Sequence, residues 1–177
     1  IPLGELKNIY ENLAEEGAEH IFSIHLAKEL SGTVEGARMA GEMVKDKVQV
    51  HVIDSESATI GLGLLVLATA QAVEMGMPPT ELETYIANVI RKQDLFFLLD
   101  SLDNLQKGGR IGKAGYLVGS LLNIKPILRL KDSYIHAYEK VRGNRNEKAM
   151  NRMIDIMVEH IDPNKKVYCA VGYCDNR

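Results

Sequence analysis

The sequence lacks several features by which large classes of protein are recognised. Its 177 residues carry no excess of positive charge, with a formal net charge of −3 and a pI near 6.0, whereas nucleic-acid-binding domains usually show a basic domain or stripe. It also lacks low-complexity stretches, and 46% of its residues are hydrophobic. We therefore expect an ordinary globular protein, of one large or two small domains, that does not bind nucleic acid.

Cysteine is nearly absent. Cys169 and Cys174 lie close together near the end of the sequence, and no second pair of metal ligands accompanies them. A structural zinc site needs four ligands at characteristic spacing. We interpret both cysteines as free thiols, which favours a reducing compartment and a cytoplasmic protein, and we expect neither a metal nor a cofactor.

Long uncharged runs are also scarce. Residues 57–73 carry no charged side chain, but two glycines and three polar residues dilute the run, namely Thr59, Gly61, Gly63, Thr69 and Gln71. A membrane-spanning helix needs about 20 predominantly apolar residues. We therefore predict a buried helix over residues 58–75 and no membrane span.

What the first half does contain is an alternation of helical and strand patterns. The spacing of apolar side chains predicts helices over residues 4–16, about 34–44, 58–75 and about 80–92. A short, largely apolar run predicts a strand over 20–26, and a run rich in β-branched residues predicts a second strand over 48–53. This order is typical of an α/β fold with a parallel sheet and helices on both faces, in which ligands bind at the carboxyl ends of the strands.

The pattern changes after residue 93. We predict a strand over 94–99, a short helix over 101–107, a helix over 112–122, a hairpin of strands 124–130 and 134–138, a helix over about 144–161 and a last strand over 167–171. The inward face of the helix over 144–161 is predicted to carry Met150, Met153, Ile154, Met157, Val158 and Ile161. We therefore predict two domains, an α/β domain over residues 1–93 and an α+β domain over residues 94–177.

The candidate site lies where the first strand passes into the next helix, at residues 30–33 (Leu-Ser-Gly-Thr). Ser31 or Thr33 can cap the helix, and Gly32 lets a ligand approach the backbone. The first N–H groups of a helix have no intrahelical partner and favour an anion. This junction is therefore predicted to hold a carboxylate or a phosphate.

Four segments together resemble the DegV family of bacterial proteins. They are residues 30–33, residues 52–55 (Val-Ile-Asp-Ser), residues 100–111, which include Lys-Gly-Gly-Arg-Ile, and residues 121–128, which include Asn-Ile-Lys-Pro-Ile. The resemblance covers essentially the whole chain. It implies a two-domain α/β protein that binds a long-chain fatty acid, with the carboxylate at the domain junction and the acyl chain in an apolar tunnel.

The resemblance also implies site residues and a partner. Ser31 matches the serine that contacts the fatty-acid carboxylate, with Gly32 and Thr33 beside it, and Arg110 matches the arginine near that head group. The family presents the fatty acid to a separate kinase subunit that makes acyl phosphate, so the chain itself is not expected to be an enzyme. Candidate tunnel residues are Leu62, Leu64, Leu65, Leu67, Leu117, Val118, Leu121 and Leu122.

The chain departs from the family pattern in two respects. Where the family commonly has serine or threonine before Leu-Ser-Gly-Thr, this chain has Ala27 and Lys28. Family members also begin earlier, with a further strand, and end later, with a histidine-bearing segment, whereas this sequence starts at Ile1. We therefore expect the N-terminal strand of the first domain and the C-terminal part of the second to be missing from this chain.

A serine at a strand-to-helix junction also occurs in three other classes of protein. A hydrolase based on Ser31 would need a Gly-x-Ser-x-Gly elbow, and a nucleotide-binding protein would need one of the glycine-rich phosphate loops; neither motif occurs. A small-anion or sugar-phosphate binder is the stronger rival, because a helix N-terminus takes phosphate as readily as carboxylate. The histidines, including His25 in the first strand, are predicted to be structural, since none has a neighbour in sequence that makes a ligand pair.

Overall fold

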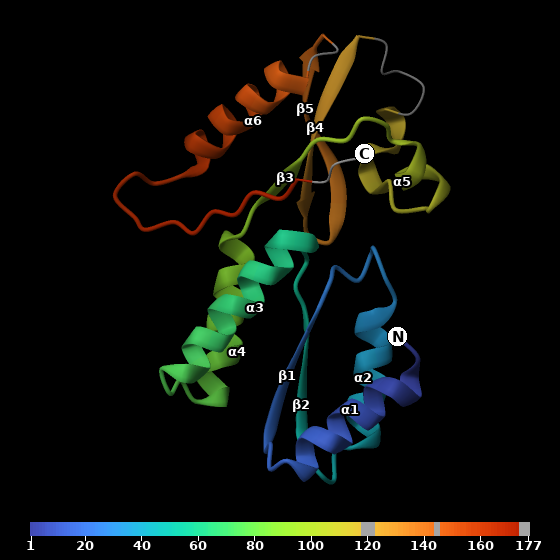
Figure 1. Cartoon of the computed structure of the whole chain (residues 1–177), viewed down its shortest axis with the longest axis vertical. Coiled ribbons are helices and arrows are strands. Elements are labelled where there is room, and N and C mark those ends of the chain that lie inside the picture. Colours follow the sequence, from blue (N-terminus) through green and yellow to red (C-terminus); the bar gives the residue numbers. More distant parts are fainter. Residues whose placement is uncertain (118–122, 144–145, 174–177) are drawn as a thin grey trace. The chain divides into compact units, whose positions relative to one another are not determined.

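The computed structural model describes residues 1–117, 123–143 and 146–173, and the chain folds as two compact units, residues 1–93 and 94–177 (Figure 1). The first unit contains, in order, α1 (Leu3–Glu15), β1 (His20–His25), α2 (Thr33–Met43), β2 (Gln49–Asp54), α3 (Thr59–Glu74) and α4 (Pro79–Lys92). This is the alternation that apolar spacing predicts.

The two strands of the first unit are parallel and in register from His20 opposite Gln49 to His25 opposite Asp54. Because side chains alternate across a strand, each face of the pair meets different helices. Ile21, Val50 and Val52 pack with α1 and α2, and Phe22, Ile24 and Ile53 pack with α3 and α4. Figure 1 shows α1 and α2 on one side of the strands and α3 and α4 on the other. The predicted α/β class, with helices on both faces of a parallel sheet, is confirmed.

Helix α3 is buried on one face only, so the prediction of a fully buried helix is wrong. Leu65 is 0% exposed and packs with Leu82 and Ile86 of α4, but Val66 and Leu67 are 44% and 54% exposed. Because residues 57–73 are uncharged, the sequence does not show which side of the helix is buried. The position of the sheet decides it. Within the described ranges, no helix is long and apolar enough to cross a membrane.

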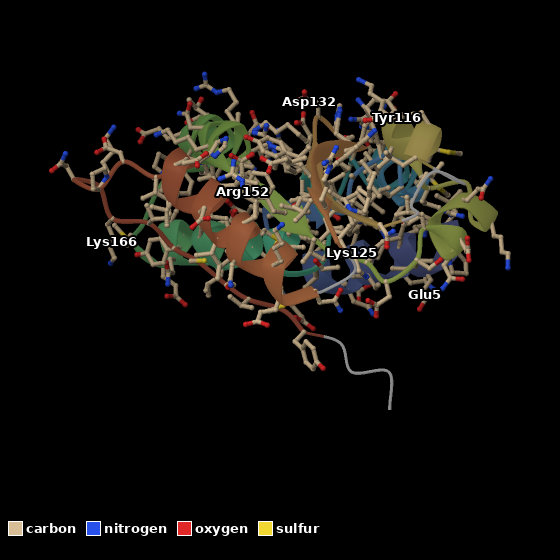
Figure 2. All side chains as sticks on the ribbon, turned by 90° about the horizontal axis from the view of Figure 1, so that it is seen from above. Glu5, Tyr116, Lys125, Asp132, Arg152 and Lys166 are labelled. Carbon is tan, nitrogen blue, oxygen red and sulfur yellow. The ribbon has the colours of Figure 1, made fainter. Side chains whose placement is uncertain are left out.

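The second unit is built on an antiparallel sheet in the order β3-β4-β5. Its elements are β3 (Leu95–Phe97), α5 (Asp103–Lys107), the 3₁₀ helix η1 (Gly112–Leu117), β4 (Ile124–Lys131), β5 (Tyr134–Arg142) and α6 (Asn146–His160). The predicted hairpin is confirmed as β4 and β5. Asp132, labelled in Figure 2, and Ser133 connect them, both with positive φ (51° and 67°), as tight hairpin turns require.

Helix 112–122 was predicted from small and apolar residues, but the structure has only the six-residue 3₁₀ helix η1 there, and residues 118–122 lie outside the described part of the chain. Gly112 explains the difference. It adopts φ +57°, and a Cβ atom on it would lie 3.0 Å from the backbone nitrogen and oxygen of Ile135. This conformation is left-handed, so Gly112 allows close packing on β5 but does not fit an α-helix.

Helix α6 forms where expected, but its predicted inward face is largely wrong. Ala149 and Ile156 are fully buried against Ile127 and Val141 of the sheet, with Met153 beside them. Four of the predicted inward residues are exposed by 36–64%, namely Met150, Ile154, Val158 and Ile161. The helix has apolar residues on two sides, so helical spacing by itself does not show which side the sheet covers. Arg152, labelled in Figure 2, fastens α6 to β5 through two 2.9 Å hydrogen bonds to Glu139.

The strand predicted over residues 167–171 is absent, because these residues have no regular structure. Val167 is 49% exposed and Val171 90% exposed. β-branched residues favour extended backbone, but a strand exists only where a neighbouring strand accepts and donates its hydrogen bonds. Cys169 in this segment is an exposed free thiol, as predicted, and Cys174 lies outside the described residues.

Candidate functional site

The sequence-predicted serine and threonine meet at the carboxyl end of β1. Ser31 Oγ lies 2.6 Å from Thr33 Oγ1, and the backbone N–H of Thr33 points to Ser31 Oγ at 3.4 Å. Among the described residues, a Cβ atom added to Gly32 would have no heavy atom within 4 Å. Two paired hydroxyl groups therefore stand beside an open stretch of backbone.

This pair lies at the N-terminus of α2, which has 11 residues and starts at Thr33. Gly32, and not Ser31 or Thr33 as predicted, occupies the N-cap position, and it supplies no side-chain oxygen to the first turn. The N–H groups of that turn have no intrahelical acceptor, and the helix dipole gives this end a partial positive charge. The arrangement can accept a carboxylate or a phosphate oxygen, as the sequence predicts.

A second loop, residues 55–58 between β2 and α3, is hydrogen-bonded to the first, as is Asp54 at the end of β2. The backbone N–H of Ala27 donates to the carbonyl of Ser57 at 2.7 Å, and that of Lys28 donates to Asp54 Oδ1 at 3.2 Å. The backbone N–H of Ser55 donates to the carbonyl of His25 at 3.0 Å. Because parallel strands end at the same edge of a sheet, the two loops form one surface there.

The loop after β2 contains two buried serines and has a residue with positive φ within it and another at its end. Ser55 and Ser57 are 0% and 1% exposed, and Ser57 Oγ makes no hydrogen bond within the described residues. Glu56 and Thr59 have φ of 52° and 46°, which is uncommon outside glycine, especially for a β-branched residue. Residues 52–55 are one of the four segments that resemble the DegV family, but no site residue is predicted among them; the sequence cue was a second polar cluster directly after a strand.

His25, at the end of β1, is a further polar group that sequence analysis assigned to structure alone. Its Nε2 lies 2.7 Å from Ser23 Oγ, which lies 2.6 Å from the hydroxyl of Tyr10 in α1. Burial lowers the pKa of His25 below its ordinary value of 6.5. The imidazole is therefore neutral at physiological pH and takes part in a partly buried hydrogen-bond chain.

Arg110 belongs to the second unit, directly after the turn that ends α5. Gly109 adopts φ +72°, and the backbone N–H of Arg110 donates to the carbonyl of Leu105 at 2.8 Å. The exposed guanidinium donates from Nη1 to the carbonyl of Gly108 at 2.6 Å. The permanently charged guanidinium of Arg110 therefore stands on a glycine-flanked turn that a backbone hydrogen bond holds in place. Its assignment to a ligand site stays a prediction.

The candidate tunnel residues are placed unequally. Leu65 belongs to the packed core, Leu62 and Leu64 are half-buried, and Leu67 is exposed. Leu117 in η1 is 1% exposed, while Val118, Leu121 and Leu122 lie outside the described residues. Two of the open hollows in the described part of the chain, of about 480 and 500 Å³, lie beside the amino ends of the strands and on α4, and neither is lined by these leucines or by Ser31.

No group of three histidine, cysteine, aspartate or glutamate side chains within the described ranges is arranged to hold a metal ion. The imidazole of His51 donates from Nδ1 to Glu83 Oε1 of α4 at 2.6 Å and stacks on Phe22. That contact joins the sheet to α4.

Comparison with known proteins extends these observations. The model of the DegV family matches residues 1–177. A DegV domain-containing protein of Listeria monocytogenes is 38% identical over 154 residues, which are 87% of this chain and 53% of that protein. The chain therefore spans about half the length of the curated relatives it matches.

Two solved structures of bacterial relatives are similar throughout most of the chain. A fatty-acid-binding DegV family protein from Thermus thermophilus superposes with a TM-score of 0.81 at 30% identity, over 90% of this chain and 55% of that one. DegV from Bacillus subtilis, described as a fatty acid binding protein, superposes with a TM-score of 0.79 at 33% identity, over 89% of this chain and 55% of that one. Structural neighbours of this chain thus bind fatty acids.

Proposed function

The chain belongs to the DegV family, and we propose that it binds a long-chain fatty acid whose carboxylate is held at Ser31, Gly32 and Thr33. The observation that carries this proposal is the hydroxyl pair of Ser31 and Thr33, 2.6 Å apart, at the N-terminus of α2, where the N-cap residue Gly32 makes no side-chain hydrogen bond. Fatty acid binding by the relatives from Thermus thermophilus and Bacillus subtilis supports the same ligand class.

The acyl chain and the carboxylate of a fatty acid contribute different amounts to the free energy of binding. Burying about 14 methylene groups at about 0.8 kcal/mol each contributes roughly 11 kcal/mol before association costs. A hydrogen bond to a carboxylate contributes about 1.5–3 kcal/mol. An apolar tunnel would therefore supply most of the affinity, while the hydroxyl groups at α2 orient the head group.

The second part of the proposal concerns what happens to the bound acid. In this hypothesis the chain is not an enzyme; it presents the carboxylate to a separate kinase subunit, which forms the acyl phosphate. Arg110 then stabilises negative charge on the acid or its phosphorylated product, because a guanidinium is always protonated and donates in a fork that fits carboxylate and phosphate oxygens.

A small-anion or sugar-phosphate ligand is the alternative, since the N-terminus of α2 suits phosphate as well as carboxylate. The two ligand classes differ in what lies behind the anion. A lipid needs an apolar tunnel, and a sugar needs polar partners for its hydroxyl groups.

Mass spectrometry of lipid extracted from the purified protein tests the choice. We expect a fatty acid of about 14 to 18 carbons, as the burial of a long acyl chain requires, and we expect added hexadecanoate to displace it. Recovery of a phosphosugar, or of nothing that hexadecanoate displaces, would show that the proposal is wrong.

A further inference from the structure

Three side chains of the first unit form a continuous hydrogen-bonded chain that leads to the carboxyl end of β1. It starts at Tyr10 in α1, which is 2% exposed. The hydroxyl of Tyr10 lies 2.6 Å from Ser23 Oγ, and Ser23 Oγ lies 2.7 Å from His25 Nε2. Ser23 and His25 are two residues apart in one strand and therefore face the same helices.

The direction of the protons in this chain follows from the burial of Tyr10. The tyrosine hydroxyl has one partner in the described structure, Ser23 Oγ. If Ser23 donated to Tyr10, the tyrosine proton would be left without an acceptor in the core, which costs about 1–3 kcal/mol. Tyr10 therefore donates to Ser23. Among the described residues the proton of Ser23 has no acceptor other than His25 Nε2, so we infer that Ser23 donates to that nitrogen.

A neutral histidine whose Nε2 accepts a hydrogen bond carries its proton on Nδ1. Burial keeps this imidazole neutral by lowering its pKa. The structure shows no hydrogen bond from Nδ1 to any described residue. A donor of fixed position is therefore available at the last residue of β1.

The place of His25 in the fold connects this donor with the ligand edge of the sheet. His25 pairs with Asp54 at the carboxyl ends of the two parallel strands, and its carbonyl accepts the N–H of Ser55. The loop that follows it leads within six residues to Ser31. Ligands of parallel sheets bind outside these strand ends.

We propose that His25 is a further ligand of the fatty-acid head group, with its Nδ1–H donating to a carboxylate oxygen, and that Tyr10 and Ser23 are positioning residues that hold the required tautomer. The inference rests on the proposed function and adds a neutral donor to the hydroxyl groups of Ser31 and Thr33. A neutral donor orients the carboxylate without adding a second permanent charge to the site.

The tautomer can be tested without any ligand. In ¹⁵N-detected NMR of the full 177-residue chain, His25 should show a protonated Nδ1 and an unprotonated Nε2. Tyr10→Phe, which removes the first donor of the chain, should shift His25 toward the opposite tautomer. Finding the proton on Nε2 in the unmodified protein would overturn the inference.

Titration of the same sample with hexadecanoate tests the contact itself. The Nδ1 and Hδ1 signals of His25 should move on saturation, whereas those of His136, in β5 of the second unit, should not. If hexadecanoate binds and the His25 signals stay unchanged, the inference is wrong while the proposed function stands. If hexadecanoate does not bind at all, both are wrong.

Matched substitutions measure the size of the effect. Gln places its amide near the position of Nε2 and keeps the contact with Ser23, whereas Asn places its amide near Nδ1. His25→Gln should weaken hexadecanoate binding by about tenfold or more, as loss of a hydrogen bond to a charged group requires, and should weaken hexadecanol binding less. His25→Asn should recover part of the loss, and His136→Gln should bind like the parent. Equal losses for hexadecanoate and hexadecanol would assign His25 a structural role only.

Discussion

The backbone N–H of Ala27 donates to the carbonyl oxygen of Ser57 at 2.7 Å. This bond joins the loop after β1 to the loop after β2, so the segment that leads to Ser31 does not stand alone. Ala27 is 0% exposed and Ser57 is 1% exposed, which shields the bond from water. The hydroxyl pair at α2 is consequently held on a supported loop, and substitutions there should change binding without unfolding the protein.

Ser31→Ala is expected to weaken hexadecanoate binding by about 1.5–3 kcal/mol at most, because it removes one hydrogen bond to a carboxylate and leaves the N–H groups of α2 in place. Isothermal titration measures the change. Ser101→Ala is a matched control, since Ser101 Oγ also accepts a backbone N–H at a helix start, that of Asp103 at 3.0 Å, in the second unit. Unchanged affinity in Ser31→Ala would place the head group elsewhere.

Arg110→Ala is expected to bind hexadecanoate still but to support acyl-phosphate formation far less well, because the lost charge acts on the acid or its phosphorylated product. A fluorescent fatty-acid titration and a coupled assay with the kinase subunit measure the two effects separately. Arg38→Ala, which breaks only an exposed ion pair with Glu35 in α2, is the control. Parental activity in both assays would contradict the role of Arg110.

Glu11 makes the stability of the first unit depend on pH. Hydrogen bonds from Lys47, at 2.7 Å, and from Lys7 lower the pKa of its carboxyl from 4.5 to about 2. A lowered pKa in the folded state stabilises the protein above the unfolded pKa, and the stabilisation is lost as pH falls toward the folded pKa. Glu11→Gln should therefore be less stable than the parent at neutral pH.

Urea unfolding at several pH values checks this expectation. The difference between the parent and Glu11→Gln should shrink as pH falls through the interval between the two pKa values of Glu11, 4.5 and about 2. Glu16→Gln, at an exposed position just after α1, should show no such trend. A difference that does not vary with pH would mean that the carboxyl has an ordinary pKa.

The two sides of α6 should respond very differently to truncation. Ile156→Ala is expected to lower the free energy of unfolding of the second unit by about 2–5 kcal/mol, because Ile156 is fully buried against the sheet. Ile154→Ala, at a residue that is 54% exposed, should change it by no more than about 0.5 kcal/mol. Thermal unfolding of both variants provides the comparison, and equal losses would mean that α6 packs by its other side.

Much of the fold could be predicted because its determinants are local. The spacing of Leu6 and Tyr10 predicts α1, and the β-branched run at Val50 and Val52 predicts β2. The α/β class follows from the order of such segments, and the place of Ser31 and Thr33 at the start of a helix follows from the strand-to-helix junction. These inferences need only residues that are neighbours in sequence.

Other features could not be predicted, because they depend on residues far apart in sequence. Ile154 and Ile156 are equally apolar, and only the sheet beneath α6 decides that Ile156 is buried. Residues 167–171 are rich enough in β-branched side chains for a strand, but the described structure provides them with no strand partner.

The position of His25 depends on the sequence alone, whereas its hydrogen-bond partners depend on the tertiary structure. The sequence by itself determined that a histidine stands at the end of β1, next to the junction that holds Ser31. Only the tertiary structure placed Tyr10 of α1 within hydrogen-bond distance of Ser23 and so completed the chain from which we infer which ring nitrogen of His25 carries the proton. The physical reason is that a tautomer is set by its hydrogen-bond partners, and these partners come together only when α1 packs on the sheet.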